Sequence, residues 1–467
     1  MSHALRTLMR TPAFAAAAVL TLGLGIAAAG SMFAIVYGVL LAPLPFGRPA
    51  QLVDIGLDTV SHGRMQQPPA LYFTYRRHAT QLADVGFYRT GNANIRRQGA
   101  DDAPERITAT WLTASMVPLL EVPPLLGRSF TADEERPGGT TAAMLSESEW
   151  RTRFGASPDV LGQILMVNDV PREIVGVMPA RFAFPSADTR VWLSARLPTD
   201  AVVGEFAYAA VGRLKPGARV AQAQQELDAL LPRMAEAFPR LESGGATAHW
   251  LTEVVPKPIV RPLRDALTAD IARTLWMLAA AAVLVLLVAW ANVTNLMLIR
   301  ADARQNELAV RATLGASRWR IATHFLGESC WLGAAAGVFA LFATGGALRA
   351  VVAYAPAEIP RLSELGLGLA TVGFIALIVA TSIALCAAVP ALRWQRGRLS
   401  ERLRDGARGE PAGKPRQRLR MGIAALQIAL ALVVSLGSAL LLRTAQRLNA
   451  VHPGFDGHDV TVLWTLL

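Results

Sequence analysis

The chain has 467 residues, of which 52% are hydrophobic, and a net charge of +11. This apolar share excludes an ordinary soluble protein, and the length allows several structural units. The excess positive charge falls in three short segments beside long apolar runs, namely residues 1–12 (+2), 299–322 (+3) and 393–420 (+7). That distribution is the positive-inside pattern of a membrane protein, so it predicts cytoplasmic segments and excludes nucleic acid as a partner.

The first apolar run, residues 13–42, follows Arg6 and Arg10 and contains no charged residue. A cleaved signal peptide is one interpretation, because Ala27–Ala29 offers small residues for a cleavage site. The apolar run continues well beyond that site, however, and a helix of about 20 residues already crosses a bilayer. We therefore predict that residues 1–42 form a cytoplasmic N-terminus and an uncleaved first transmembrane helix.

Residues 43–272 have the composition of a water-soluble domain, and a cytoplasmic N-terminus places them outside the membrane. Within them, Ser146–Glu149 fits a capping box that opens a short helix ending at Phe154. Two strands follow it, at residues 163–167 and 172–177, around an Asn-Asp turn at residues 168–169. We expect an α+β domain.

The sequence lacks the motifs of common enzymes. It has no GxxxxGK[ST], no HExxH and no GxSxG, and its acids and histidines show no spacing suited to general acid–base chemistry. The two cysteines, Cys330 and Cys386, lie in or beside apolar runs and offer no disulfide framework or metal site. We therefore predict no enzymatic activity, no cofactor and no metal, and any ATPase must be a separate chain.

Three further apolar spans are predicted within residues 273–392, at 274–299, 321–348 and 367–392. Near the cytoplasmic end of the middle span, His324 and Glu328 are candidate functional residues because they are ionisable within a span, but both could reach the interface, so we favour anchoring at the level of the lipid headgroups. Gly333 and Gly337 form a small-residue face for helix packing in the same span. A basic linker (393–420) and a fifth span (421–442, within 421–467) complete the chain.

The polar connection at residues 300–320 has helical features. Arg304, Glu307 and Arg311 fall on one helical face, and Glu307 to Arg311 is the favourable order of an i,i+4 ion pair. Gly315 offers a C-terminal stop, and Ser317 can cap a second helix. A rigid elbow that receives a partner is one interpretation, and a solvated loop with arginines on lipid headgroups is the other.

These residues also carry a resemblance. Asn292–Leu296, followed by Arg304-x-x-Glu307 and the run to Ser317, resembles the FtsX-like permease signature of the MacB type. Two further blocks resemble the MacB-type periplasmic core domain, namely Leu126–Glu134 and residues 145–193, although that family more often has glycine where Asp169 stands. The resemblance implies that the elbow is the coupling element that contacts an ATP-hydrolysing subunit.

The basic lead and long span at the end of the chain repeat the layout of its beginning. This layout is similar to that of the acidobacterial duplicated orphan permeases (ADOP), in which two halves follow one another. Because the chain stops where a second external domain would begin, we expect a protein truncated after its first half.

We therefore expect an α-helical membrane protein with about five transmembrane helices and an α+β extracytoplasmic domain inserted between the first two. The resemblance implies a permease subunit of an ABC-type efflux or mechanotransmission system in the bacterial inner membrane. Its expected partners are a separate ATP-binding subunit, membrane lipids and a second subunit in a homo- or heterodimer. Two alternatives stay open, a membrane-anchored sensor or scaffold whose external domain binds a partner, and an enzyme with an unrecognised external site.

Overall fold

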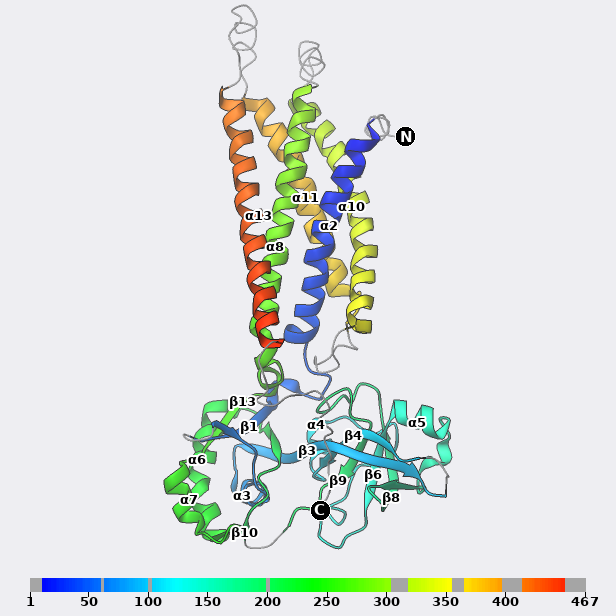
Figure 1. Cartoon of the computed structure of the whole chain (residues 1–467), viewed down its shortest axis with the longest axis vertical. Helices are drawn as coiled ribbons and strands as arrows, with labels where there is room; N and C mark the ends of the chain where they lie inside the picture. The colour runs from blue at the N-terminus through cyan, green and yellow to red at the C-terminus, as the bar shows by residue number, and fades with distance from the viewer. Residues whose placement is uncertain are drawn as a thin grey trace, which may run out of the picture. The chain divides into compact units, whose positions relative to one another are not determined.

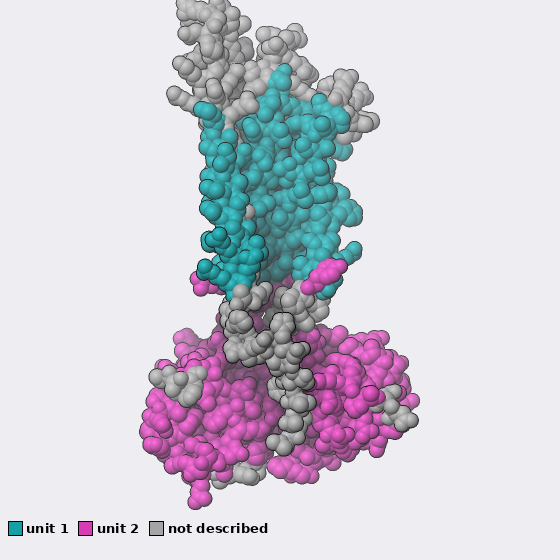
Figure 2. Space-filling view, viewed as in Figure 1, with its two compact units in different colours: residues 1–36, 274–353, 366–467 teal, residues 37–273, 354–365 magenta. Residues whose placement is uncertain are grey.

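The computed structural model describes residues 11–59, 63–99, 103–198, 202–303, 318–354, 365–396 and 414–449. The chain divides into two compact units (Figure 2). We call residues 1–36, 274–353 and 366–467 the span unit, and residues 37–273 and 354–365 the sheet unit.

Long apolar helices make up the described part of the span unit (Figure 1). The helices are α2 (Pro12–Val36), α8 (Leu263–Ala303, which enters the unit at Thr274), α10 (Arg318–Tyr354), α11 (Leu369–Arg396) and α13 (Lys414–Asn449). Among the described residues, five helical stretches are long and apolar enough to cross a membrane: Pro12–Leu41, Ile271–Ala301, Leu326–Tyr354, Leu369–Ala388 and Gln427–Thr444. Each of them overlaps a span expected from the sequence.

Helix α2 packs closely on its neighbours because its glycines leave room for them. A Cβ atom built on Gly23 would lie 2.6 Å from Phe339 of α10, and one on Gly25 would lie 2.7 Å from Ala289 of α8. Since real Cβ atoms do not approach so closely, only glycine fits at these two positions. Helix α2 therefore lies against both α8 and α10.

The sheet unit is built around a mixed β-sheet, in which some strand pairs are parallel and others antiparallel. Its main sheet joins eleven of the described strands, in the order β13-β1-β11-β3-β4-β9-β6-β8-β5, with β2 on β1 and β7 on β3 and β8. The strands are β1 (Leu52–Thr59), β2 (Gly63–Met65), β3 (Leu82–Arg97), β4 (Glu105–Leu112), β5 (Leu126–Gly127), β6 (Ala142–Ser146), β7 (Ile164–Val167), β8 (Val170–Met178), β9 (Val191–Ser194), β11 (Ala209–Leu214) and β13 (Lys257–Pro262). A separate parallel pair joins β10 (Val202–Val203) and β12 (Arg240–Leu241).

Helices cover this sheet and complete its apolar cores. They are α3 (Pro69–His78), α4 (Met116–Leu120), α5 (Glu147–Phe154), α6 (Val220–Ala237) and α7 (Thr247–Val254), with short helical turns at Tyr37–Leu41, Pro49–Gln51 and Pro158–Val160. The apolar side chains of α6 recur at helical spacing and are buried against α3 and the strands, at Ala223, Leu227, Leu230, Leu231 and Met234. A second core beneath α4 contains Phe182, Phe184 and Trp192. The expected α+β architecture is confirmed.

The start of α5 agrees in part with the predicted capping box. The hydroxyl of Ser146 accepts a hydrogen bond from the N–H of Glu149 at 3.1 Å. The reciprocal half of the prediction is wrong, because the Glu149 carboxylate accepts from Arg153 and Arg190 instead. Two guanidinium groups bind a buried carboxylate more strongly than one backbone N–H does.

The predicted hairpin after α5 is confirmed. Strands β7 and β8 pair antiparallel from Val167 and Val170 outward, so Asn168 and Asp169 form a two-residue turn. Both turn residues have positive φ, 48° and 62°, as a type I′ hairpin turn requires. Asp169 thus occupies a left-handed position that suits glycine better.

A side chain of α6 covers the outer edge of the main sheet. The carboxamide oxygen of Gln224 accepts from the N–H of Val260 at 2.7 Å, and its nitrogen donates to the carbonyl of Pro258. Both partners belong to β13, the last strand on this side of the sheet. Gln224 therefore takes the place that the backbone of a further strand would fill.

Candidate functional site

The predicted elbow residues, Arg304, Glu307, Arg311, Gly315 and Ser317, lie outside the described residues. Their role in partner binding stays a prediction. The helices on both sides of them are described, since α8 ends at Ala303 and α10 begins at Arg318. The described part of the candidate site therefore consists of these two helix ends.

An ion pair joins α8 to α10 close to the elbow. Arg300 Nε lies 3.8 Å from Glu328 Oε2, and the two side chains are only 10% and 3% exposed. The guanidinium of Arg300 also lies 4.5 Å from the ring centroid of Phe14 in α2, within the range of a cation–π contact. Residues from three helices of the span unit thus meet beside the elbow.

The interpretation of Glu328 as a headgroup anchor is wrong. A headgroup anchor is exposed at the surface of the helices, whereas Glu328 is buried next to Arg300. The side chain of His324 lies outside the described residues. The missed signal was Arg300 at the end of the preceding span, because an ionisable residue near a span is most stable beside an opposite charge.

Small residues and one polar contact fix other helix pairs of the span unit. A Cβ atom on Gly333 would lie 2.4 Å from Ile383, and one on Gly337 would lie 2.9 Å from Val379, so the small-residue face of α10 packs on α11 as predicted. Trp290 Nε1 of α8 donates to Ser382 Oγ of α11 at 2.7 Å. The described helices on either side of the elbow therefore also contact α11.

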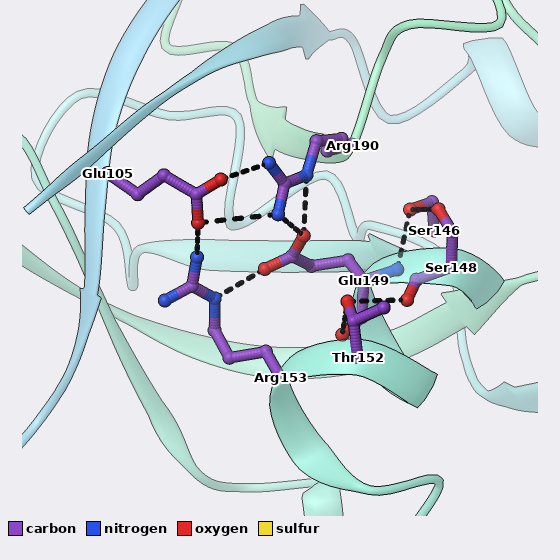
Figure 3. A network of polar contacts seen from close by, with 7 residues as sticks. All are labelled: Glu105, Ser146, Ser148, Glu149, Thr152, Arg153 and Arg190. Atoms are coloured by element: carbon purple, nitrogen blue, oxygen red, sulfur yellow. Dashed lines mark hydrogen bonds and ion pairs between the residues drawn. The ribbon is translucent and has the colours of Figure 1, made fainter.

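The most extensive ion network of the sheet unit surrounds Glu149. Its carboxylate, fully buried, accepts from Arg153 and from Arg190 Nε, the latter at 2.7 Å. Both arginines also pair with Glu105, so carboxylates and guanidiniums alternate around a ring (Figure 3). Hydrogen bonding from Arg190 lowers the pKa of Glu105. This network ties β4, α5 and the start of β9 together, and it occupies both carboxylates.

The other motif residues of the sheet unit also have structural roles. Arg128 donates to both carboxylate oxygens of Glu134, at 3.1 and 2.7 Å, and the N–H of Thr131 donates to the same carboxylate at 2.8 Å. Gly127 has φ of +75°, and a Cβ atom there would lie 2.2 Å from the carbonyl of Val175. These residues therefore stabilise a turn and a close approach of two strands.

A buried polar cluster lies at α3 and contains Tyr72, Ser115 and Glu135. Tyr72 Oη lies 3.4 Å from Ser115 Oγ, which itself lies 2.8 Å from the carbonyl oxygen of Val85. Burial raises the pKa of Glu135, whose carboxylate accepts from the N–H of Ala114 at 3.2 Å. The hydroxyl of Ser115 donates to the carbonyl of Val85, and no hydrogen bond joins it to Glu135 among the described contacts, so the cluster does not have the paired nucleophile and base of an activated serine.

The described residues contain no group of three or more His, Cys, Asp or Glu side chains that could hold a metal ion. The free cysteines Cys330 and Cys386 are both in the span unit. The candidate functional site is therefore at the helix ends beside the elbow and not in the sheet unit.

Two families match this chain. Residues 15–230 match the MacB-like periplasmic core domain, and residues 279–395 match the FtsX-like permease C-terminal domain. Among similar proteins are the macrolide export ATP-binding/permease proteins MacB of Escherichia coli O157:H7, E. coli K12 and Shigella flexneri. Each is 27% identical over 219 residues, which is 45% of this chain. The matched region spans 31% of the length of these relatives.

Solved structures of external domains are also similar. The periplasmic region of MacB from Actinobacillus actinomycetemcomitans is 11% identical with a TM-score of 0.33, and covers 49% of this chain and 94% of its own. A domain of a putative permease from Porphyromonas gingivalis is 16% identical with a TM-score of 0.33, and covers 46% of this chain and 92% of its own.

Proposed function

We propose that this chain, which carries a MacB-like periplasmic core domain and an FtsX-like permease domain, is the permease subunit of an ABC-type efflux or mechanotransmission system. In this proposal a separate subunit hydrolyses ATP, and the permease transmits the resulting motion to residues 43–272. The observation that carries it is the presence of both domains in one chain with several apolar helices. The sequence has no P-loop, which is why the ATPase is assigned to another chain.

The proposed topology is a multi-pass protein of the inner membrane with its N-terminus in the cytoplasm. Five spans cross the membrane, and the external domain is inserted between the first two. The five candidate helices and the three basic segments beside apolar runs support this arrangement. The same topology places the elbow at residues 300–320 in the cytoplasm, where an ATPase subunit can reach it.

The proposed contact with the ATPase subunit is made by the elbow. The residues proposed for this contact are Arg304, Glu307 and Arg311, which the sequence predicts on one helical face, together with Gly315 and Ser317, the predicted helix stop and cap. In this proposal the elbow passes force to the two apolar spans that it connects. We assign the chain no catalytic activity of its own.

Two finer features belong to the same proposal. The repeated order of basic segment and long span supports the duplicated orphan permease subtype (ADOP). Membrane lipids contact the exposed apolar side chains of the spans, such as Phe342 and Leu377, and a second permease subunit completes a dimer.

The test is a capture experiment on detergent-solubilised full-length protein. The wild type is compared with the double variant Glu307→Arg, Arg311→Glu, and captured chains are identified by mass spectrometry and assayed for vanadate-sensitive ATP hydrolysis. We expect the wild type to capture a P-loop ATPase and the variant to capture at least ten-fold less of it.

A matched control uses the same exchange in the sheet unit. Glu147 and Arg151 form an i,i+4 ion pair on α5, so Glu147→Arg, Arg151→Glu changes the same charges at the same spacing. This control should capture as much ATPase as the wild type. If no ATPase accompanies the wild type, the transport proposal is wrong and a sensor or scaffold is favoured.

A further inference from the structure

We propose that Arg300, Glu328 and Phe14 form a positioning cluster that sets the spacing of the two helix ends beside the elbow and links them to α2. The functional consequence rests on the proposed function, because the spacing of these helix ends affects coupling only if the elbow contacts an ATPase subunit. Its structural part stands by itself. It concerns residues outside the predicted elbow face and assigns them a role in holding that face in place.

The first support is the position of the three residues. Arg300 lies three residues before the end of α8, and Glu328 lies in the first turn of the candidate span that begins at Leu326. Phe14 lies two residues after the start of α2. The three residues meet although α2, α8 and α10 are distant in sequence, so the contact ties three helices at the same end of their spans.

The second support is the burial of the charges. An ionisable side chain inside a membrane span is costly, and it is found paired and directed into the helix bundle. Arg300 and Glu328 follow this pattern, with exposures of 10% and 3%. Because replacement of such a pair by apolar residues is often neutral for stability, we infer that this pair contributes to the specific arrangement of the helices rather than to the strength of their association.

The third support is the geometry of the arginine. Its guanidinium contacts Glu328 through Nε and faces the ring of Phe14 at 4.5 Å. A guanidinium can use its edge for a carboxylate and its face for an aromatic ring at the same time, which lysine cannot do as well. The arrangement therefore defines a direction as well as a distance between the helix ends.

The fourth support is the hydrogen-bonding capacity nearby. Within the described residues, Asn295 Oδ1 of α8 and Ser329 Oγ of α10 are buried and have no hydrogen-bond partner. Buried polar groups without partners are rare. These two groups lie on the same two helices as the ion pair, five residues before Arg300 and one residue after Glu328 in the chain, so the ion pair lies in a polar part of both helices.

The test measures the distance between the helix ends directly. Spin labels are attached at Ala303→Cys and Leu326→Cys, two exposed positions on α8 and α10, in a background with Cys330→Ser and Cys386→Ser. Double electron–electron resonance on the full-length chain in lipid nanodiscs then gives the distance distribution. We expect one narrow distribution for the unmodified pair and at least a two-fold broader one for Glu328→Gln.

Rescue separates positioning from simple loss of a charge. The exchange Arg300→Glu, Glu328→Arg restores an opposite pair between α8 and α10 but removes the guanidinium that faces Phe14. It should therefore narrow the distribution between α8 and α10 again and recover part of the ATPase capture that Glu328→Gln is expected to lose. Arg349→Gln is the matched control, because it removes an exposed arginine near the opposite end of α10 and should change neither readout. If Glu328→Gln does not fold, Glu328→Asp, which keeps the charge on a shorter side chain, should give an intermediate width.

The outcomes distinguish this inference from the proposed function. An unchanged distribution in folded Glu328→Gln overturns the positioning role, even if the wild type captures an ATPase. A broadened distribution in Glu328→Gln that the exchange narrows again supports the role, even if no ATPase is captured by the wild type. A broadened distribution that the exchange leaves broad overturns it, because the pairing itself would then not set the spacing.

Discussion

The sheet unit and the span unit hold their elements together in different ways. In the sheet unit, buried charged groups are bound from several sides: Glu149 by two arginines, and Arg213 by the carbonyls of Leu119 and Gly47. In the span unit, helices meet mainly through small residues such as Gly25 and Gly337. Both units have apolar cores, so the difference lies in the buried charged groups: the sheet unit adds directional contacts to its cores, and the described span unit has few of them.

The physical cause of the difference is the number of backbone groups that each unit must satisfy between elements. Sheet strands and loops leave carbonyls and N–H groups for side chains to bind, as Arg213 does. Helices in lipid satisfy their backbone internally, so their association depends on packing and a few polar contacts. Against that background the buried pair of Arg300 and Glu328 stands out as the exception in the described span unit.

The largest effect is expected from Glu149→Ala. The change leaves the guanidiniums of Arg153 and Arg190 without their buried partner, and breaking a buried ion pair in this way costs about 3 kcal/mol. Pulse proteolysis of the full-length chain in urea would measure the loss. The control is Glu147→Ala, which removes a more exposed ion pair on the same helix and should cost less than about 1 kcal/mol.

The comparison would fail if Glu149→Ala and Glu147→Ala had equal effects. Equal losses would mean that the network around Glu149 adds nothing beyond an ordinary surface pair. The sheet unit would then depend on apolar packing to the same degree as the span unit.

The next largest effect is expected from Gly25→Ala in the span unit. The new methyl group would lie 2.7 Å from Ala289, so α2 and α8 must move apart, at a cost of about 1.5 kcal/mol. Gly373→Ala is the control, because no atom lies within 4 Å of a Cβ there. Thermal unfolding in detergent would measure both, and an unchanged midpoint for Gly25→Ala would contradict close packing at this position.

A smaller and opposite effect is expected from Asp169→Gly in the hairpin turn. Glycine adopts the positive φ of this position without the steric cost that a Cβ atom carries, so we expect a gain of about 0.5 kcal/mol. The exposed pair of Asp169 with Arg96 at 3.4 Å is lost, which matters little. Urea unfolding would measure the gain, and a loss of stability would mean that Asp169 has a further role in the turn.

The smallest effect is a change in acid sensitivity at Glu226. Burial acts to raise its pKa, but hydrogen bonds from Thr80 and from the N–H of Gln81 outweigh burial, and the pKa is lowered overall. A lowered pKa means that the stabilising contribution is present above the unfolded pKa and is lost as pH falls through the folded pKa. Glu226→Gln should therefore flatten the fall in stability between about pH 5 and pH 3. An identical acid slope in wild type and variant would contradict it.

Local signals made part of this structure predictable. The hairpin at Asn168–Asp169 and the start of α5 at Ser146 depend on residues within a few positions of each other, so the sequence indicates them directly. Apolar run length likewise predicted the candidate spans, since crossing a bilayer requires a minimum number of residues. The two glycines of α10, Gly333 and Gly337, were correctly interpreted as packing positions.

The remaining features depend on residues far apart in the chain. The parallel pairing of β4 with β9 brings Arg190 beside Glu105. Arg190 also binds the Glu149 carboxylate, which therefore does not accept from the backbone N–H of Ser146 as the capping box predicted. Glu328 was misinterpreted for the same reason, because its burial depends on Arg300 of the preceding span. The residues predicted to bind the ATPase, Arg304 to Ser317, lie outside the described structure, so sequence similarity alone supports their role.

The edge strand β13 has a consequence for how other proteins can approach the sheet unit. Val260 presents its N–H outward to Gln224, so the alternate residues Pro258 and Pro262 face the same way, and proline has no N–H to offer. The described edge therefore lacks a free donor along three alternate positions. An extended peptide cannot join the sheet there by strand addition, and neither can the same edge of a second molecule. A protein partner on this side must be recognised by side chains, and the exposed edge is protected against aggregation.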